Sequence, residues 1–378
     1  MANFPILSLT LFLPLIAAIV IMFIPRDKEQ TIKVTAAVAT FISLLLSIAV
    51  FIGYDQSVSG MQFVERITWT PDIGVSYALG VDGISIPMLL LTTLIGFSSV
   101  FASWNTKDRV KEFFVLLLIL ITGVMGTFLT TDLFIFFLFY EVVVIPIYLM
   151  VIMWGSSKRV TKEYAGMKLT IYLLIGSAFL LVGLVMIFVQ AYLLNGTPTM
   201  DLFELAGLQF STGFQIFVFA LMAFGFGTLL SMFPFHAWSP DGYAGAPTAV
   251  SMIHAGVLKK IGGYGLIRIG LFLLPAGAQV IAPIIAVLAI GNVVYAALIC
   301  LSQKDLKYIV GYSSVSHMGY VLIGIAALNL ISINGAIIMM FAHGVMAALF
   351  FAMIGNLYEK SHTRNIDDFG GLAHQMPK

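Results

Sequence analysis

Long uninterrupted runs of apolar residues, separated by short polar segments, make up most of this chain. Eleven of these runs approach or exceed the roughly 20 residues that an α-helix needs to cross a lipid bilayer. They cover residues 4–24, 32–53, 79–104, 113–129, 133–153, 165–194, 214–233, 249–274, 280–301, 308–328 and 331–358. Because apolar residues follow one another instead of alternating with polar ones, an outer-membrane β-barrel is disfavoured. The pattern predicts an all-α, polytopic membrane protein with one membrane domain over residues 1–378, with connections at 55–77 and 195–213 and no separate soluble domain.

One stretch, residues 233–270, departs from this pattern. Its first part contains Pro234, Pro240 and Pro247 within fourteen residues, together with His236 and Asp241. Proline removes a backbone donor and clashes with the preceding turn of a helix. We therefore predict a broken helix here, with a polar loop between its two parts that admits water.

The distribution of basic residues predicts how the chain is oriented. The connections that follow even-numbered runs, which would lie on one side of the membrane, contain a single basic residue, Arg66. The segments that follow odd-numbered runs, on the other side, contain fourteen: Arg26, Lys28, Lys33, Lys107, Arg109, Lys111, Lys158, Arg159, Lys162, Lys304, Lys307, Lys360, Arg364 and Lys378. Since cytoplasmic loops are enriched in Lys and Arg, the N-terminus is expected outside and the C-terminus in the cytoplasm. The membrane is expected to be a bacterial inner membrane.

The composition of the chain argues against several kinds of ligand and cofactor. The chain is 60% hydrophobic and 10% charged, and its net charge of +1 gives no sign of nucleic-acid binding. The single Cys300 excludes an internal disulfide, and no CxxC pair or glycine-rich nucleotide loop is present. No two histidines share a metal-binding i,i+3 or i,i+4 spacing. We expect no cofactor and no metal in this chain.

A few ionisable residues lie inside the apolar runs, where a charge is costly and usually functional. Glu141 lies near the middle of its run, and Lys259 and Lys260 lie together in another. Adjacent helical residues point about 100° apart, so the two lysines are expected to face different neighbours. The alternatives are a permanent structural ion pair for Glu141 and a snorkelling route to the membrane surface for one lysine.

The histidines extend this set. His317 and His343 lie mid-span and His254 lies near Lys259, so each could pass a proton near neutral pH. A neutral histidine hydrogen-bonded between helices is the alternative. Lys168 lies nearer a span end, where functional proton transfer and plain snorkelling are both open.

Three segments resemble a known family, the antiporter-like membrane subunits of respiratory complex I. They read LGVDGISIPMLLL at 79–91, FHAWSPDGYAGAPTAVSMIHAGVLKKIGGYGL at 235–266 and DLKYIVGYSSVSHMGY at 305–320. FAHGVMAALFF at 341–351 and YEKSHTRNIDDFGGL at 358–372 fit the chain 4, or chain M, type of NADH-quinone oxidoreductase subunit. The resemblance implies about fourteen helices, a broken helix seven and inverted five-helix repeats. The repeats would be residues 110–274 and an incomplete 275–378.

The resemblance also implies a function. Such a subunit moves protons, while FMN, iron–sulfur clusters and quinone are held by partner subunits of the complex. By motif position Glu141 matches the glutamate of helix five and Lys260 the lysine of helix eight, and His317 and His343 match the central hydrophilic axis. A multisubunit cation/proton antiporter or a membrane-bound hydrogenase subunit is the alternative. A structural scaffold is disfavoured because it needs no buried charge, and the sequence leaves H⁺ versus Na⁺ open.

Two departures from the family pattern bear on this expectation. Leu229 stands where the family has the lysine that partners the helix-five glutamate, and Lys259 stands where leucine is common. Lys259 could compensate if it lies in the interior and is joined to Glu141 directly or through water. The sequence also ends after eleven runs, short of the family's helices twelve to fourteen.

Overall fold

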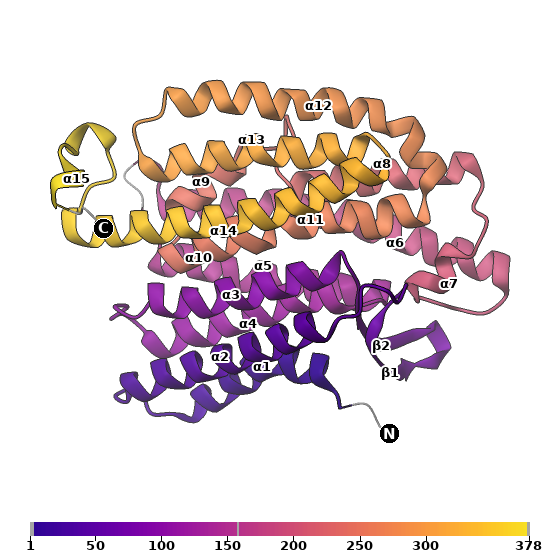
Figure 1. The fold of residues 1–378 in the computed structure, drawn as a ribbon, viewed down its shortest axis with the longest axis horizontal. Helices are drawn as coiled ribbons and strands as arrows, with labels where there is room; N and C mark the ends of the chain where they lie inside the picture. The colour runs from indigo at the N-terminus through magenta and orange to yellow at the C-terminus, as the bar shows by residue number, and fades with distance from the viewer. Residues whose placement is uncertain (1–3, 157–158, 376–378) are drawn as a thin grey trace.

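The computed structural model describes residues 4–156 and 159–375, which form a bundle of long helices lying roughly side by side (Figure 1). Ten helices of the described residues are long and apolar enough to cross a membrane, which confirms the predicted all-α polytopic class. They are α1 (Ile6–Phe23), α2 (Glu29–Gly53), α3 (Ser85–Ala102), α4 (Val110–Leu129), α5 (Leu133–Trp154), α6 (Lys162–Asn195), α8 (Thr212–Leu229), α12 (Pro275–Leu301), α13 (Leu306–Ala326) and α14 (Leu330–Ser361).

The remaining predicted span, 249–274, is helical but not uniformly α-helical. It consists of α10 (Thr248–Ile253), the π-helical η2 (His254–Leu258), α11 (Lys260–Gly265) and the π-helical η3 (Leu266–Leu271). In η2 the backbone N–H of Lys259 donates to the carbonyl of His254, five residues back. π-Turns are rare and are frequent at functional sites. This π-turn directly precedes the two adjacent lysines.

The predicted broken helix is also present. After α8 ends at Leu229, the chain is not helical again until α9 (Trp238–Gly245), and Ser231 adopts a left-handed φ of 61°. The three prolines do not each break a helix, however. Pro240 lies in the first turn of α9, where a missing N–H leaves no helical hydrogen bond unmade, and Pro247 immediately precedes α10.

The connection predicted at 55–77 contains an element that the apolar pattern did not reveal, and this element extends into the predicted span 79–104, whose helix α3 begins only at Ser85. An antiparallel hairpin forms from β1 (Gln62–Thr70) and β2 (Val75–Val81), with η1 (Pro71–Ile73) at its turn. Gly74 closes the turn at φ 65°, and an added Cβ there would lie 2.3 Å from the Pro198 carbonyl oxygen. The other long connection contains α7 (Leu202–Ala206), and the C-terminal segment contains η4 (Ile366–Asp368) and α15 (Leu372–Gln375).

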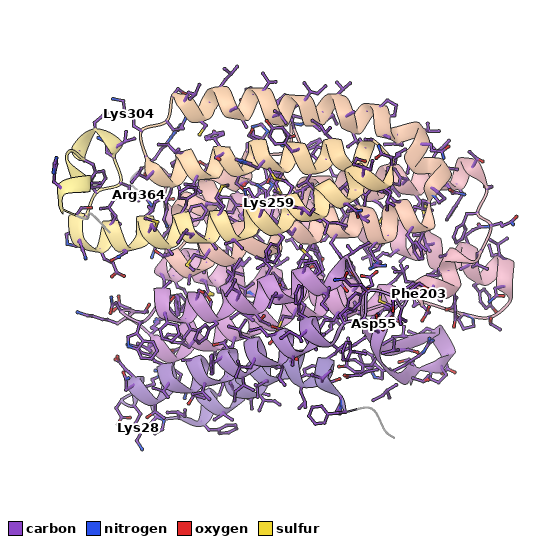
Figure 2. The ribbon with its side chains drawn as sticks, in the orientation of Figure 1. Lys28, Asp55, Phe203, Lys259, Lys304 and Arg364 are labelled. Carbon is purple, nitrogen blue, oxygen red and sulfur yellow. The ribbon has the colours of Figure 1, made fainter. Side chains whose placement is uncertain are left out.

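The two ends of the bundle differ in character. Lys28, Lys304 and Arg364 lie at one end, Asp55 and Phe203 lie at the other, and Lys259 lies between them (Figure 2). The described chain begins at the hairpin end and finishes at the opposite end (Figure 1). Lys158 and Lys378, two of the fourteen basic residues, lie outside the described residues.

Candidate functional site

Lys259 lies in the interior midway along the bundle and is fully buried. Its Nζ donates to Ser239 Oγ of α9 at 3.1 Å and lies 3.4 Å from Ser314 Oγ of α13. The same Nζ lies 5.4 Å from the centre of the Tyr243 ring. Among residues 4–156 and 159–375, no carboxylate forms an ion pair with it. Lys259 therefore meets hydroxyl groups where a buried ammonium usually meets an acid.

Lys260 points elsewhere, as the 100° offset predicts. Its Nζ is fully buried, donates to the Ala255 carbonyl and lies 2.8 Å from Nδ1 of His343 on α14. The rings of His343 and His317 lie 5.4 Å apart, and Nδ1 of His317 is 2.8 Å from the Ser313 carbonyl oxygen. The structure thus brings together three of the predicted site residues in a line across α11, α14 and α13.

His254 lies beside both lysines and is fully buried. Its ring stacks on Trp238 with 5.2 Å between centres and meets the Tyr243 ring edge-on at 5.1 Å. Neither ring nitrogen has a hydrogen-bond partner among the described residues. A buried imidazole in this state keeps one free donor and one free acceptor for a water molecule or a moving proton.

Glu141 lies apart from this cluster on α5. Its Oε1 is buried without a hydrogen-bond partner among the described residues, and Ser177 of α6 is the polar side chain beside the carboxylate. No ion pair joins it to a described cation. Lys259 is in the interior as expected, but its ammonium reaches Ser239 and Ser314, so the direct contact with Glu141 is not made.

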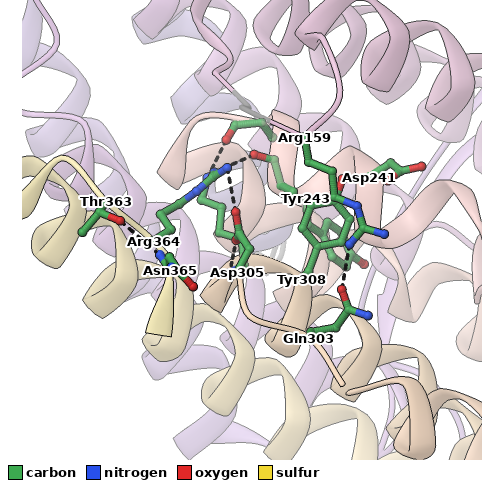
Figure 3. Close-up of polar contacts among 12 residues, drawn as sticks. Arg159, Asp241, Tyr243, Gln303, Asp305, Tyr308, Thr363, Arg364 and Asn365 are labelled. Atoms are coloured by element: carbon green, nitrogen blue, oxygen red, sulfur yellow. Dashed lines mark hydrogen bonds and ion pairs between the residues drawn. The ribbon is translucent and has the colours of Figure 1, made fainter. Parts of the chain in front are cut away.

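The polar groups at the basic end form a second cluster (Figure 3). Lys168 pairs with Asp241 at 2.7 Å, and the Tyr308 hydroxyl donates to the other Asp241 oxygen at 2.8 Å. The Arg159 guanidinium covers the Tyr308 ring at 4.6 Å and donates to Gln303 at 2.8 Å. Lys168 is therefore paired with the acid of the helix-break segment.

His236, the other polar residue predicted in that segment, is buried against aromatic rings. It stacks on Phe233 with 5.6 Å between ring centres and meets Tyr295 edge-on at 5.3 Å. Its Nδ1 has no hydrogen-bond partner among the described residues.

A cavity of about 690 Å³ opens beside the second cluster, at the basic end. Its lining includes Arg159, Gln303 and Lys304 from the α5–α6 and α12–α13 connections. Arg364 also lines it, pairs with Asp305 at 3.0 Å and donates to the Ala244 carbonyl at 2.9 Å. The cavity gives water a place next to the Arg159–Gln303 hydrogen bond.

Lys307 and Arg364, which the sequence assigned to loops, are in fact buried. Lys307 donates to the Ala246 carbonyl at 2.7 Å, next to the Arg364 contact at the C-terminal end of α9. Cations are stabilised there because the last carbonyls of a helix carry partial negative charge. Both residues therefore fix the end of α9 that adjoins the basic end of the bundle.

Asn292 was missed by the sequence analysis. Its side chain is fully buried and donates to the Ser231 carbonyl at 2.7 Å, while its Oδ1 accepts from the Phe233 N–H at 2.5 Å. It therefore satisfies the backbone groups that the break between α8 and α9 leaves free. A lone asparagine in the apolar run 280–301 was the signal. Arg268, another ionisable residue of the spans, pairs with Asp82.

At the opposite end, Asp132 in the short link between α4 and α5 is buried and accepts backbone N–H groups of Ser76, Phe134 and Ile135 at 2.9–3.1 Å. Burial raises the pKa of its carboxyl to about 6, against the lowering effect of these hydrogen bonds.

Comparison with known proteins agrees with this architecture. Residues 130–378 match the family described as NADH:quinone oxidoreductase/Mrp antiporter, TM. The chain belongs to this family. It is 40% identical over 379 residues to NAD(P)H-quinone oxidoreductase chain 4 2 of Microcystis aeruginosa, covering 100% of this chain and 67% of that protein. It is 38% identical to NAD(P)H-quinone oxidoreductase chain 4 of Prochlorococcus marinus strain NATL2A, covering 100% of this chain and 69% of that protein.

Solved structures show the same family fold. A chain of respiratory complex I from Thermus thermophilus matches with a TM-score of 0.88 and 25% identity, over 98% of this chain and 75% of that one. A chain of the Mrp complex from Dietzia sp. DQ12-45-1b matches with a TM-score of 0.80 and 20% identity, over 99% of this chain and 39% of that one. The chain spans about two thirds of the length of the curated relatives.

Proposed function

We propose that this chain is a proton-translocating membrane subunit of an NADH (or other donor):quinone oxidoreductase. The observation that supports it most directly is the contact between Lys260 and His343, continued by His317. These are three groups that can each gain and lose a proton, held in sequence inside a membrane protein. The curated relatives named above are all quinone oxidoreductase subunits, which favours this function over a cation/proton antiporter.

In the proposed route, protons enter from the basic end through the cavity lined by Arg159. The Arg159 guanidinium covers the ring of Tyr308, whose hydroxyl donates to Asp241 of the Lys168 pair. From the break between α8 and α9 they reach Lys259, and His254 lies beside both Lys259 and Lys260. Lys260 then passes them toward His343 and His317. Water fills the gaps in this route, as is usual where a helix is broken inside a membrane.

The remaining parts of the proposal concern the complex. The redox reaction takes place on partner subunits that hold FMN, iron–sulfur clusters and quinone, and this chain contributes no redox site. Residues 110–274 form one antiporter-like repeat and 275–378 part of a second. The basic end faces the cytoplasm of a bacterial inner membrane, with the N-terminus outside. Glu141 takes and releases a proton at one side of the route.

The test is Lys260→Met in the native complex, because methionine keeps the length of the side chain and removes its charge. Membrane vesicles containing the complex should then reduce quinone with a proton uptake per electron pair that falls clearly below that of the wild type. Lys360→Met, at the exposed end of α14, is the matched control. Wild-type uptake in a fully assembled Lys260→Met complex would overturn the proposal. Purification with flavin and iron–sulfur partner subunits would separate this function from an antiporter.

A further inference from the structure

The side chains that surround the Lys259 ammonium indicate more than that Lys259 belongs to the proposed proton route. Its ammonium is enclosed by hydroxyl-bearing side chains from two elements: Ser239 and Tyr243 of α9 and Ser314 of α13. All three are at most 1% exposed. A lysine removed from water normally needs a counter-ion, and the described residues supply none.

Hydroxyls and carboxylates differ in the hydrogen bonds that they can form with a lysine. An ionised carboxylate only accepts hydrogen bonds, so it stabilises the ammonium and opposes its deprotonation. A hydroxyl has one donor and two acceptor positions and can rotate between them. It can accept from the ammonium and, after the proton leaves, donate to the lone pair of the amine. A hydroxyl pair therefore supports both states of the same lysine.

We propose that Ser239 and Ser314 are positioning residues that hold Lys259 in both protonation states, so that Lys259 can load a proton at the helix break and release it toward Lys260. The proposal rests on the proton-translocating function above. The step balances within the chain, because the amine lone pair takes up one proton and gives up the same proton. The two serine hydroxyls reverse their roles without ionising.

The placement of the two serines supports this assignment. Ser239 belongs to α9, which directly follows the break, and is two residues from Asp241 of the Lys168 pair. Ser314 belongs to α13, the helix that also carries His317. Lys259 thus connects the helix-break segment with the helix of the histidine pair, while its neighbour Lys260 reaches the same pair through His343.

The experiment compares Ser239→Ala/Ser314→Ala with Ser239→Thr/Ser314→Thr in the complete complex. Ser316→Ala is the matched control, since Ser316 is a buried serine of the same helix whose hydroxyl bonds a backbone carbonyl at 3.0 Å. The readout is proton uptake by vesicles per quinone reduced, measured as a function of pH.

We expect the double alanine variant to lose about fivefold or more in uptake, because each lost hydrogen bond weakens the loaded state. Its half-maximal uptake should move to lower pH, since bonds to the ammonium are stronger than bonds to the amine. The threonine variant should restore both, and Ser316→Ala should change neither. An unchanged pH profile in the alanine variant, or an equal loss in Ser316→Ala, would overturn the proposal. If Lys260→Met still lowered uptake in that case, the proton-translocating function would stand without the serine pair.

Discussion

Nζ of Lys260 lies 2.8 Å from Nδ1 of His343, although the two residues are 83 positions apart in the chain. Lys260 belongs to the segmented helix that follows the break, and His343 lies in the middle of α14. Both are nearly or fully buried, so neither exchanges its proton directly with bulk water. Their contact makes the protonation of one depend on that of the other.

This dependence can be measured with a double-mutant cycle. Lys260→Met and His343→Gln should each lower proton uptake by about tenfold or more, as expected for loss of a proton-transferring group. The double variant should be little worse than either single one, because residues that act in one contact are not additive. Uptake by vesicles of the assembled complex is the measurement. His362→Asn is the matched histidine control, since His362 is exposed at the C-terminal end of α14 and asparagine tolerates its left-handed φ. Fully additive losses would contradict a direct relay.

Glu141 provides a second test. Glu141→Gln removes the ionisable group but keeps its shape, so the complex should assemble while proton uptake and coupled quinone turnover fall about tenfold or more. Glu141→Asp should be milder, because the carboxylate survives and retreats by one methylene. Glu163→Gln, in the exposed first turn of α6, should be indistinguishable from wild type. Normal uptake in an assembled Gln variant would remove Glu141 from the route.

The Lys168–Asp241 pair should behave as a partly buried ion pair. Removing one partner leaves the other charge uncompensated, so Asp241→Asn and Lys168→Met should each destabilise the complex more than the double change does. The expected coupling is about 1–3 kcal/mol, measured from thermal unfolding of the detergent-solubilised complex. The exposed pair Lys304–Asp367 is the matched comparison, and its coupling should be clearly smaller, because solvent screens exposed ion pairs. Equal couplings for the two pairs would argue that the first is an ordinary surface contact.

Asp132 predicts a pH dependence of stability. Its folded pKa of about 6 exceeds the ordinary 3.8, so between these values the folded chain keeps a proton that the unfolded chain releases. The contribution is fully present below pH 3.8 and is lost as the pH rises to about 6. It amounts to at most about 3 kcal/mol, at 1.36 kcal/mol per unit. Thermal unfolding of the solubilised complex from pH 4 to 7 should show this decline, and Asp132→Asn should flatten it. The same slope in the Asn variant would assign it to another group.

Much of the fold could be predicted from the sequence because a bilayer demands long apolar helices. The hairpin was missed because Ile67 and Trp69 of β1 are exposed, so apolar residues do not alternate with polar ones as in a half-buried strand. Lys307 and Arg364 were assigned to loops because sequence position gives no sign of the helix end that they bind.

The site could be predicted only as a set of residues. Burial cost identified Glu141 and the two lysines, since each is expensive in an apolar run. Their partners could not be predicted, because a π-turn directly precedes Lys259 and Lys260 and no residue pattern predicts such a turn. The contact of Lys260 with His343 joins helices far apart in the chain and depends on tertiary packing.

The last prediction concerns Leu229, which stands where the family pattern has a lysine. Leu229 is buried at the end of α8, and two explanations of Lys259 differ over what a lysine there would do. If Lys259 merely supplies a positive charge that Glu141 needs, Lys259→Leu should lose uptake and adding Leu229→Lys should restore much of it. If Lys259 acts through Ser239 and Ser314, a charge on α8 cannot replace it, because those hydroxyls hold the amine between α9 and α13.

We expect Lys259→Leu to lower proton uptake about tenfold or more and Leu229→Lys to restore none of it. Leu229→Lys alone is the necessary control, since a buried lysine without a partner costs about 2.5–3.5 kcal/mol on insertion scales and could impair assembly by itself. The amount of assembled complex and its uptake should therefore be measured for all three variants. Substantial restoration in an assembled double variant would show that the position of the charge near Glu141, and not the contact with the serines, is what the route requires.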